Sequence, residues 1–240
     1  MPNSSLKIVH SLPLHELSNR WILDIFGTRY SFRAGQYLIY QNDKPNKIYI
    51  FLEGWANSHK IFGDEHKQIV NYVLPGDIVG LQFDETEKSP YMIEAVTDVK
   101  VLGIEKASFW EKIQTRPYLL FQILRKRERY QRELEKRIIS LTASSSFNSM
   151  IQILTLLYSR LNLVGIPEED AKYFPINQLQ LSEVLSISYI HTHRIFNRLE
   201  KMDFVTKKKH HIHLIDVKGL RKLAYDQSEI QELDRKKRVG

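Results

Sequence analysis

The sequence contains no cysteine, and it also contains no long apolar run. Without cysteine the chain has no disulfides, no thiolate metal sites and no cysteine-bound iron–sulfur clusters. No uninterrupted apolar run approaches the roughly 18 residues of a membrane-spanning helix. Residues 1–10 lack the basic region and apolar stretch of a secretory signal. We therefore expect a protein of the cytoplasm that has no membrane partner.

The motifs of several enzyme classes are absent as well. The sequence shows no Walker or Rossmann glycine pattern, no nucleophile elbow and no obvious paired-carboxylate site. We expect that the protein is not an enzyme and that it uses no cofactor.

The basic residues are distributed unevenly along the chain, whose net charge is +7 with neutral histidine. Residues 1–116 hold 13 Lys and Arg against 14 Asp and Glu, whereas residues 117–240 hold 22 against 14. The whole positive excess therefore lies in the second half, as a domain that neutralises phosphates requires. Charge alone is equally compatible with a solvated basic surface that has no partner.

Residues from about 28 to 105 have the pattern of short strands separated by turns. Residues 48–52 and 69–74 have the apolar and aromatic composition of strands. Turn formers such as Glu53-Gly54 and Pro75-Gly76-Asp77 separate such runs. The pattern predicts an α+β chain whose residues 1–116 form an antiparallel β-barrel or sandwich.

From Pro117 onward the apolar period becomes helical. The positions that recur at alternating spacings of four and three are Leu120, Leu124, Arg127, Gln131, Leu134, Ile138 and Leu141. This is the a/d stripe of a coiled coil over about three heptads, on an otherwise densely charged helix. We expect residues 117–141 to form a dimerisation helix, because a second copy would bury the stripe. A helix that docks on its own barrel is the alternative.

The next segment, residues 142–146, consists of small and hydroxyl-bearing side chains and breaks the helical pattern. Its hydroxyls can cap the following helix, and we expect the segment to act as a hinge. Residues 147–240 then form a third region, which starts with a helix whose apolar residues from Met150 to Leu161 share one face.

Two short helices with a tight break are predicted around residues 177–200. Asn177 followed by Gln180 resembles a capping box at the start of the first helix, and Ser188 can cap the second. In the second helix the apolar residues fall on one face, which leaves polar side chains on the other. The residues expected to contact DNA there are Ser188, Tyr189, Ile190, His191, His193, Arg194, Asn197 and Arg198.

The chemistry of this outer face matches that of base edges in a major groove. Arginine can bind guanine, asparagine can bind adenine, and an exposed aliphatic side chain can meet a thymine methyl group. His191 and Arg198 lie on one flank, where they could hold phosphates.

Immediately afterwards, residues 204–206 and 212–215 have the composition of two short strands around a lysine turn. This arrangement predicts the wing of a winged helix-turn-helix, with Lys207, Lys208 and Lys209 placed for phosphate contact. The alternative is a helical hairpin with a solvated basic loop.

Five of the nine histidines lie between residues 191 and 213, so a metal site has to be considered. His191 and His193 point in different directions on a helix, whereas ligand pairs usually lie three or four residues apart. With no cysteine and no HExxH motif, we expect no metal. Histidine beside phosphates is the simpler interpretation.

The order of a small β-barrel, a long central helix and a winged helix-turn-helix resembles the Crp/Fnr family of bacterial transcription regulators. The resemblance covers about residues 15–225, and its most specific segments are residues 51–55, 74–80 and 185–194. It implies that residues 1–116 form a jelly roll like that of cyclic-nucleotide-binding domains, with an effector- or sensor-like role. It also implies a homodimer formed by the long helix, and duplex DNA as a partner. RNA polymerase would be a further partner if the protein is an activator.

The chain departs from the family where cyclic AMP would bind. In the cyclic-AMP-responsive members a Glu follows the glycine numbered Gly80 here, and an Arg-Ser pair holds the cyclic phosphate. This chain has Leu81 and Ser89-Pro90 at those positions. The possible effector pocket is formed by Gly80, Leu81, Gln82, Ser89 and Pro90. Without the charge-assisted phosphate contact we expect no control by cyclic AMP, and the effector stays unidentified.

The leading interpretation is a sequence-specific transcription regulator that binds a palindromic operator as a homodimer. The family's Arg-Glu-x-x-x-Arg helix entry keeps only Arg194, so we expect a different operator. The alternative is a small-ligand signalling module whose helical domain contacts a protein partner. A face for a protein partner would be more apolar than one that carries Arg194, Asn197 and the three lysines.

Overall fold

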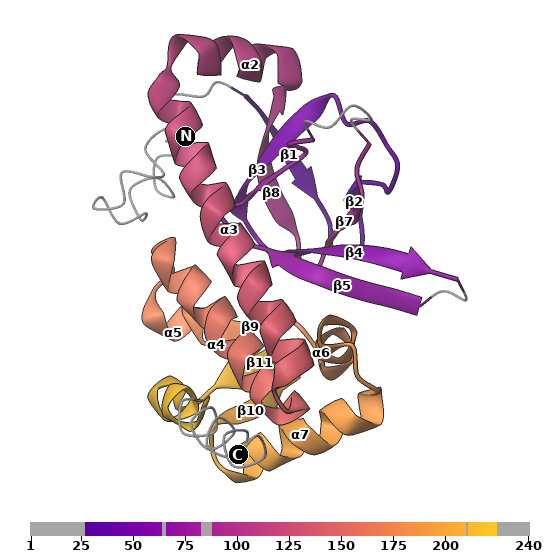
Figure 1. Ribbon diagram of the computed structural model, residues 1–240, viewed down its shortest axis with the longest axis vertical. Coiled ribbons are helices and arrows are strands. Elements are labelled where there is room, and N and C mark those ends of the chain that lie inside the picture. Colours follow the sequence, from indigo (N-terminus) through magenta and orange to yellow (C-terminus); the bar gives the residue numbers. More distant parts are fainter. Residues whose placement is uncertain (1–26, 64–65, 83–87, 210, 225–240) are drawn as a thin grey trace, which may run out of the picture. The chain divides into compact units, whose positions relative to one another are not determined.

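The computed structural model describes residues 27–63, 66–82, 88–209 and 211–224, without the side chains of residues 140–143. The chain divides into two compact units. The first contains residues up to 127 and residues 163–166, and the second contains the rest. The long helix α3 (Pro117–Ala143) contributes its first residues to one unit and its remaining residues to the other (Figure 1).

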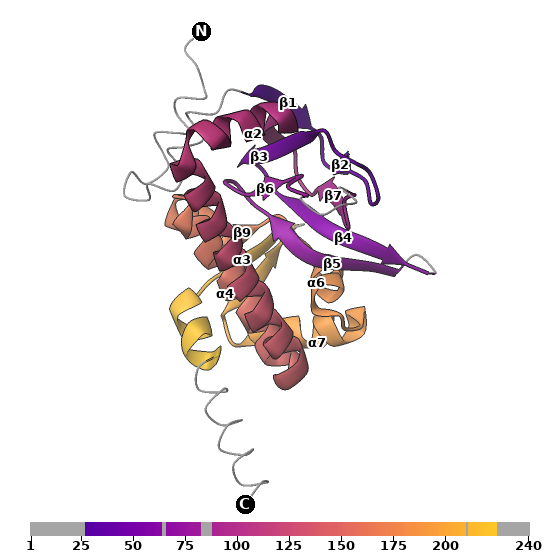
Figure 2. The same ribbon diagram turned by 45° about the horizontal axis from the view of Figure 1, so that its top comes forward.

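The first unit consists of short strands followed by helix α2 (Lys106–Thr115) and the start of α3. The strands are β1 (Thr28–Phe32), β2 (Tyr37–Ile39), β3 (Lys47–Glu53), β4 (Ala56–Phe62), β5 (His66–Val73), β6 (Ile78–Val79), β7 (Met92–Ala95) and β8 (Val99–Glu105). They pair in two four-stranded antiparallel sheets, β1-β8-β3-β6 and β2-β7-β4-β5 (Figure 2). The predicted fold class is confirmed, and the strands form a jelly-roll-like sandwich in which no pairing among the described residues closes the sheets into a continuous barrel.

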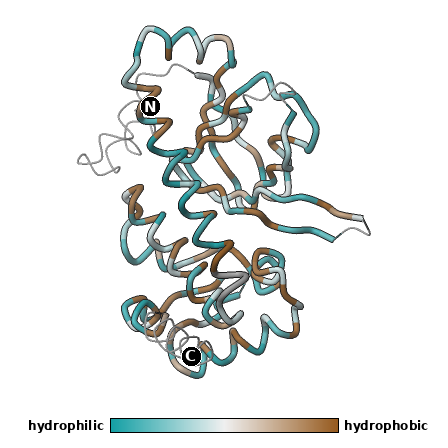
Figure 3. Tube along the Cα trace, in the orientation of Figure 1, coloured by the Kyte–Doolittle hydropathy of each residue, from teal (hydrophilic) through white to brown (hydrophobic). Residues whose placement is uncertain are grey.

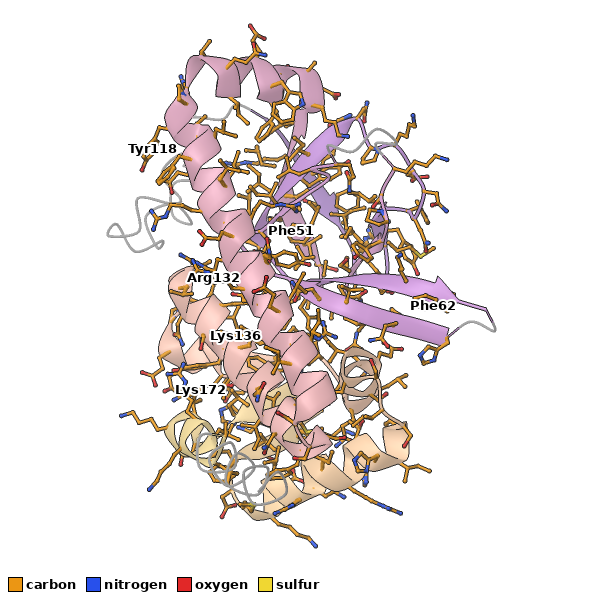
Figure 4. All side chains as sticks on the ribbon, viewed as in Figure 1. Phe51, Phe62, Tyr118, Arg132, Lys136 and Lys172 are labelled. Carbon is orange, nitrogen blue, oxygen red and sulfur yellow. The ribbon has the colours of Figure 1, made fainter. Side chains whose placement is uncertain are left out.

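Residues 48–52 are apolar without interruption because they belong to β3, a strand that is buried on both faces. Its side chains alternate between two faces, and both faces are covered. Phe51 packs between the sheets in a cluster with Ile93 of β7 (Figure 4). Ile48 and Ile50 point the other way and pack with Phe109 of α2. Complete burial of each such side chain contributes about 1.5–3 kcal/mol to the stability of this unit.

One side of the first part of α3 belongs to the same core. Leu119 and Ile123 are buried in the cluster that α2 covers. The Lys126 ammonium donates to the Gly76 carbonyl oxygen and lies 3.9 Å from the Asp77 carboxylate. These contacts fix the start of α3 on the turn between β5 and β6.

The sheet β2-β7-β4-β5 also contains a polar cluster around the buried side chain of His59, which the sequence did not indicate. His59 Nδ1 lies 2.5 Å from Asn57 Oδ1 and 3.8 Å from a Glu94 carboxylate oxygen, and Lys67 pairs with the same carboxylate at 2.5 Å. Burial lowers the pKa of His59 to about 4; the Lys67 charge acts in the same direction, and Glu94 opposes it. His59 is therefore neutral at physiological pH.

The second unit combines helices with a small sheet. After the end of α3, its elements are α4 (Ser146–Leu163), α5 (Glu168–Ala171), β9 (Tyr173–Phe174), α6 (Gln178–Leu185), α7 (Tyr189–Lys201), β10 (Val205–Lys208), β11 (His211–Leu214) and a helix over residues 217–224. The strands pair in the order β10-β11-β9. Met150, Leu154 and Leu157 of α4 are fully buried in its core. Hydrophobic and hydrophilic stretches alternate along α4, whereas the middle of α3 is mainly hydrophilic (Figure 3). The predicted winged helix-turn-helix is confirmed.

The junction between α3 and α4 is shorter than the segment 142–146 that the sequence suggested. Helix α3 continues through Ala143, so only Ser144 and Ser145 separate the two helices. The Ser145 hydroxyl accepts from the Asn148 amide at 3.3 Å, which is the cap expected of these small residues. Movement at this junction stays a prediction.

Candidate nucleic-acid interface

The first helix of the helix-turn-helix, α6, begins at the predicted capping box. Asn177 Oδ1 accepts from the Gln180 amide at 2.9 Å, and Gln180 Oε1 accepts from the Asn177 amide at 3.0 Å. Both bonds satisfy donors that a helix start leaves unpaired. Leu181, Val184 and Leu185 are the buried apolar residues of α6. The capping-box prediction is confirmed.

The turn between α6 and α7 fixes the start of the second helix. Ser186 adopts a left-handed conformation with φ of 57°, which ends α6. Ser188 then caps α7, because its hydroxyl accepts from the His191 amide at 3.2 Å. Thr192 donates its hydroxyl to the Ser188 carbonyl at 3.1 Å. The first turn of α7 is therefore held in a defined position.

Helix α7 separates its side chains into two faces as the spacing predicts. The buried face consists of Thr192, Ile195, Phe196 and Leu199. Of the residues expected to contact DNA, the exposed ones are Ser188, Tyr189, Ile190, His191, His193, Arg194 and Arg198. Asn197 is half-buried, and its Nδ2 lies 3.2 Å from His193 Nδ1. Ile190 is 66% exposed, although an aliphatic side chain gains nothing from water.

Arg194 and Arg198 occupy different surroundings on this helix. Among the described residues, no hydrogen bond or ion pair engages the Arg194 guanidinium. The Arg198 guanidinium instead lies 4.2 Å from the ring centre of Phe147 on α4. The sequence could not indicate this contact, because the two residues are 51 positions apart. Arg194 is therefore the arginine of α7 that is free to meet a ligand.

The wing consists of β10 and β11, which pair antiparallel from Val205 opposite Leu214 to Lys208 opposite His211. Lys207, Lys208 and Lys209 are all exposed, and Lys209 adopts a left-handed conformation with φ of 55°. Strand β9 pairs with β11 on the other side. The Glu200 carboxylate accepts from the Lys207 backbone amide at 3.2 Å and so joins the wing to α7.

The predicted dimer stripe lies along α3. Leu120, Leu124, Arg127, Gln131 and Ile138 are exposed, Leu134 is half-buried, and the side chain of Leu141 lies outside the described residues. Further exposed apolar residues that the a/d pattern missed are Tyr118, which lies on the outer side of α3 in Figure 4, Phe121 and Ile139. Phe121 and Ile139 directly follow the a/d positions Leu120 and Ile138, so the apolar surface is wider than a strict a/d seam.

The residues of the possible effector pocket each make different contacts in the structure. Gly80 has φ of 88°, and a Cβ there would lie 2.6 Å from the Lys47 carbonyl oxygen, so only glycine fits. Leu81 packs on the hydrophobic cluster that α2 covers. The Ser89 hydroxyl donates to the Tyr91 carbonyl at 2.7 Å, and Pro90 is exposed. Gln82 is half-buried, and its Oε1 is buried without a hydrogen-bond partner.

A hollow of about 470 Å³ lies in the second unit rather than among those residues. It is lined by α3, α4 and the helix over residues 217–224, with Lys136, Gln152 and Arg221 among its walls. Arg137 also lines it and donates to the Val184 carbonyl at the end of α6, which connects α3 to the helix-turn-helix.

The described residues contain no helix that is long and apolar enough to cross a membrane. They also contain no group of three or more His, Asp or Glu side chains that could hold a metal ion.

Comparison with known proteins gives the same architecture. Residues 29–116 match the cyclic nucleotide-binding domain. The nitrogen fixation regulation protein FixK of Bradyrhizobium diazoefficiens is 26% identical over 175 residues, which cover 73% of each chain. The transcriptional activator protein Anr of Pseudomonas protegens is 21% identical over 184 residues, which cover 77% of this chain and 75% of Anr.

Solved structures agree in fold. FixK2 from Bradyrhizobium japonicum superposes with a TM-score of 0.71 at 18% identity, covering 83% of this chain and 98% of FixK2. TTHB099, a CRP-family transcriptional regulator from Thermus thermophilus, gives a TM-score of 0.67 at 17% identity, covering 81% of this chain and 96% of TTHB099.

Proposed function

The chain belongs to the Crp/Fnr family of DNA-binding transcription regulators, and from this premise we propose that it acts as a homodimer on a palindromic operator in the cytoplasm. Each α7 would enter the major groove of one half-site, and two-fold symmetry would place the half-sites about one helical turn apart. RNA polymerase would be a partner if the protein activates transcription.

The single observation that carries this proposal is the outer face of α7. A capped helix presents an unengaged Arg194 and an exposed Ile190 beside His193, while its other face is anchored in the core. Arginine can bind the O6 and N7 atoms of guanine, and an aliphatic side chain suits a thymine methyl group. We assign base contacts to this face and phosphate contacts to Ser188, His191, Arg198 and the lysines of the wing.

Dimer formation is supported by the exposed stripe on α3. Leu124 is 57% and Ile138 61% exposed in the single chain. A helix of 27 residues is about 40 Å long, enough for several layers of coiled-coil packing. A second copy would cover this stripe.

We also propose that cyclic AMP does not control the protein. A cyclic phosphate leaves water only if a cation and hydrogen-bond donors replace its hydration. Leu81 is apolar, the Ser89 hydroxyl already donates to a backbone carbonyl, and Pro90 has no backbone donor. The effector is therefore a different molecule, if the protein has one.

The test of base reading compares Arg194→Ala with Arg198→Ala in titrations of labelled duplexes. Loss of a bidentate base contact should cost about 1–3 kcal/mol on the preferred site and relax the choice at one position of each half-site. Arg198→Ala, the matched control, should weaken all sequences alike. If Arg194→Ala also weakened every sequence equally, Arg194 would not read a base. If neither variant changed the affinity for DNA, α7 would not be the helix that contacts DNA. A protein partner of α7 would then become the better interpretation.

A further inference from the structure

The small sheet β10-β11-β9 has two chemically different faces. Its register places Val205 opposite Leu214 and Ile212 opposite Phe174, and these four side chains are fully buried. Because side chains alternate along a strand, the opposite face collects the residues between them. These are Tyr173 of β9, Thr206 and Lys208 of β10, and His211 and His213 of β11.

Three of these residues, one from each strand, form a stack. The rings of Tyr173 and His213 lie 4.1 Å apart with an interplanar angle of 15°. The Lys208 ammonium lies 5.5 Å from the centre of the Tyr173 ring and 3.5 Å from its hydroxyl. Tyr173 therefore holds the end of a long side chain that would otherwise move freely.

Among the described residues, the Lys208 ammonium has no carboxylate as an ion-pair partner. Nearby Lys172 is paired with Glu169 at 2.8 Å and with Glu168 at 3.7 Å. Among the described residues no Asp or Glu lies within ion-pair distance of Lys208. Burial lowers the pKa of His213, and the charges of Lys208 and Lys172 add to this effect, so the stacked ring is neutral at physiological pH.

The three lysines of the wing are therefore not equivalent. Lys207 lies on the other side of β10, beside the buried Val205, and Lys209 lies in the turn. In the described residues neither ammonium contacts an aromatic ring. A lysine that is already held in place loses less side-chain entropy when it binds an anion.

We propose that Lys208 is the main phosphate-binding lysine of the wing, and that Tyr173 and His213 are positioning residues that hold its ammonium for a phosphate of duplex DNA. The Tyr173 hydroxyl, at 3.5 Å from the ammonium, can donate to the same phosphate. The inference rests on the proposed function and adds to it a division of labour among the lysines and a role for β9.

The test measures the affinity of the full-length protein for a 30-base-pair duplex of arbitrary sequence as a function of salt. Lys208→Met should weaken binding about tenfold and reduce the slope of log K against log salt by about 0.9, the value for one phosphate contact. Lys207→Met and Lys209→Met are the variants for comparison. Each should also weaken binding, but by less than about threefold, because no aromatic ring holds these two ammonium groups in place.

Variants of Tyr173 test the positioning role directly. Tyr173→Leu should weaken binding in the natural chain but not in the Lys208→Met background, because the two residues act together. Tyr173→Phe keeps the ring and should restore most of the affinity. If Tyr173→Leu unfolds the domain in thermal melts, His213→Gln, which removes the ring stacked on Tyr173, takes its place in the comparison with the Lys208→Met background.

Two results would overturn the inference. Equal losses of affinity in the three lysine variants would show that Lys208 is not the main phosphate-binding lysine. Tighter binding by Tyr173→Leu would show that the ring holds Lys208 away from DNA. Failure of the proposed function can be distinguished from failure of the inference about Lys208, because without DNA binding the natural chain itself would not bind the duplex. Arg194 is intact in all these variants, so each should keep its preference for the selected operator over other sequences.

Discussion

Helices α3 and α7 both leave one face exposed in the single chain, but the two faces differ in chemistry. The face of α3 carries Leu124 and Ile138 among charged residues, whereas that of α7 carries His193 and Arg194 beside Ile190. An apolar stripe is stabilised by another apolar surface, and a basic face with forked donors is stabilised by phosphates and base edges. The contrast indicates that exposure alone does not identify a partner, but that the chemistry of the exposed side chains does.

The largest effect on binding is expected when charged side chains replace apolar ones on the exposed face of α3. Leu124→Glu combined with Ile138→Glu would place carboxylates without partners in the dimer interface. We expect the dimer dissociation constant to rise at least about a hundredfold, which equals about 3 kcal/mol, and operator binding to fall with it. Sedimentation equilibrium measures the change.

The matched control is Arg129→Glu, which changes charge on the same helix away from the stripe. This variant should remain dimeric. A double glutamate variant that also remained dimeric would place the interface elsewhere. Leu134, which the sequence placed in the seam, is half-buried in the single chain, so its substitution would also disturb the fold.

The histidines of the two units differ in the same way: His193 on α7 is exposed, whereas His59 in the first unit is buried. Because folding lowers the pKa of His59 from 6.5 to about 4, its contribution to stability is complete above pH 6.5. The contribution is lost as the pH falls from 6.5 towards 4, up to about 3 kcal/mol in the free energy of unfolding.

Urea unfolding of the natural chain and of His59→Gln, followed between pH 8 and 4, checks this dependence. The groups that face the ring in the cluster are Asn57, Lys67 and Glu94, together with the Tyr37 ring at 6.0 Å. The variant should lose less stability than the natural chain on acidification. Parallel curves for the two proteins would show that His59 is not the titrating group.

A smaller effect is expected at the start of α6. Asn177→Ala removes the side-chain acceptor of the capping box and should cost about 1 kcal/mol of stability, with little change in the dimer. Thermal unfolding measures the cost. Asn177→Asp keeps an acceptor and should be near neutral, so an equal loss in both variants would contradict the role of the cap.

The smallest effect is expected for cyclic AMP. Isothermal titration of the dimer with cyclic AMP and cyclic GMP should give no heat of binding at micromolar concentrations, and operator affinity should not change. Micromolar binding together with tighter operator affinity would show that the cyclic phosphate is held by other residues than those at positions 80–82 and 89–90.

Local patterns in the sequence were sufficient for the helix-turn-helix and for most of the architecture. The capping box at Asn177, the cap at Ser188 and the buried face of α7 each depend on residues within one or two turns. The uninterrupted apolar run in β3 is likewise typical of a strand that is buried on both faces. Such local signals are readable because a helix or strand fixes which neighbours share a face.

Contacts between distant residues could not be predicted. The position of Arg198 over Phe147, the stack of Lys208, Tyr173 and His213, and the buried His59 depend on how elements pack. The width of the α3 surface was also underestimated, because a strict heptad omits Phe121 and Ile139. Tertiary packing decides these positions, and a single sequence carries no pattern for it.

The central claim is that the face of α7 reads base sequence as part of a symmetric dimer. Selection of bound fragments from random duplex DNA, with the natural chain and with Arg194→Ala, tests it most directly. We expect the natural chain to enrich a palindrome with half-sites about one helical turn apart. We expect Arg194→Ala to lose the preference at one position of each half-site. Enrichment of no motif, or of the same motif by both proteins, would contradict it.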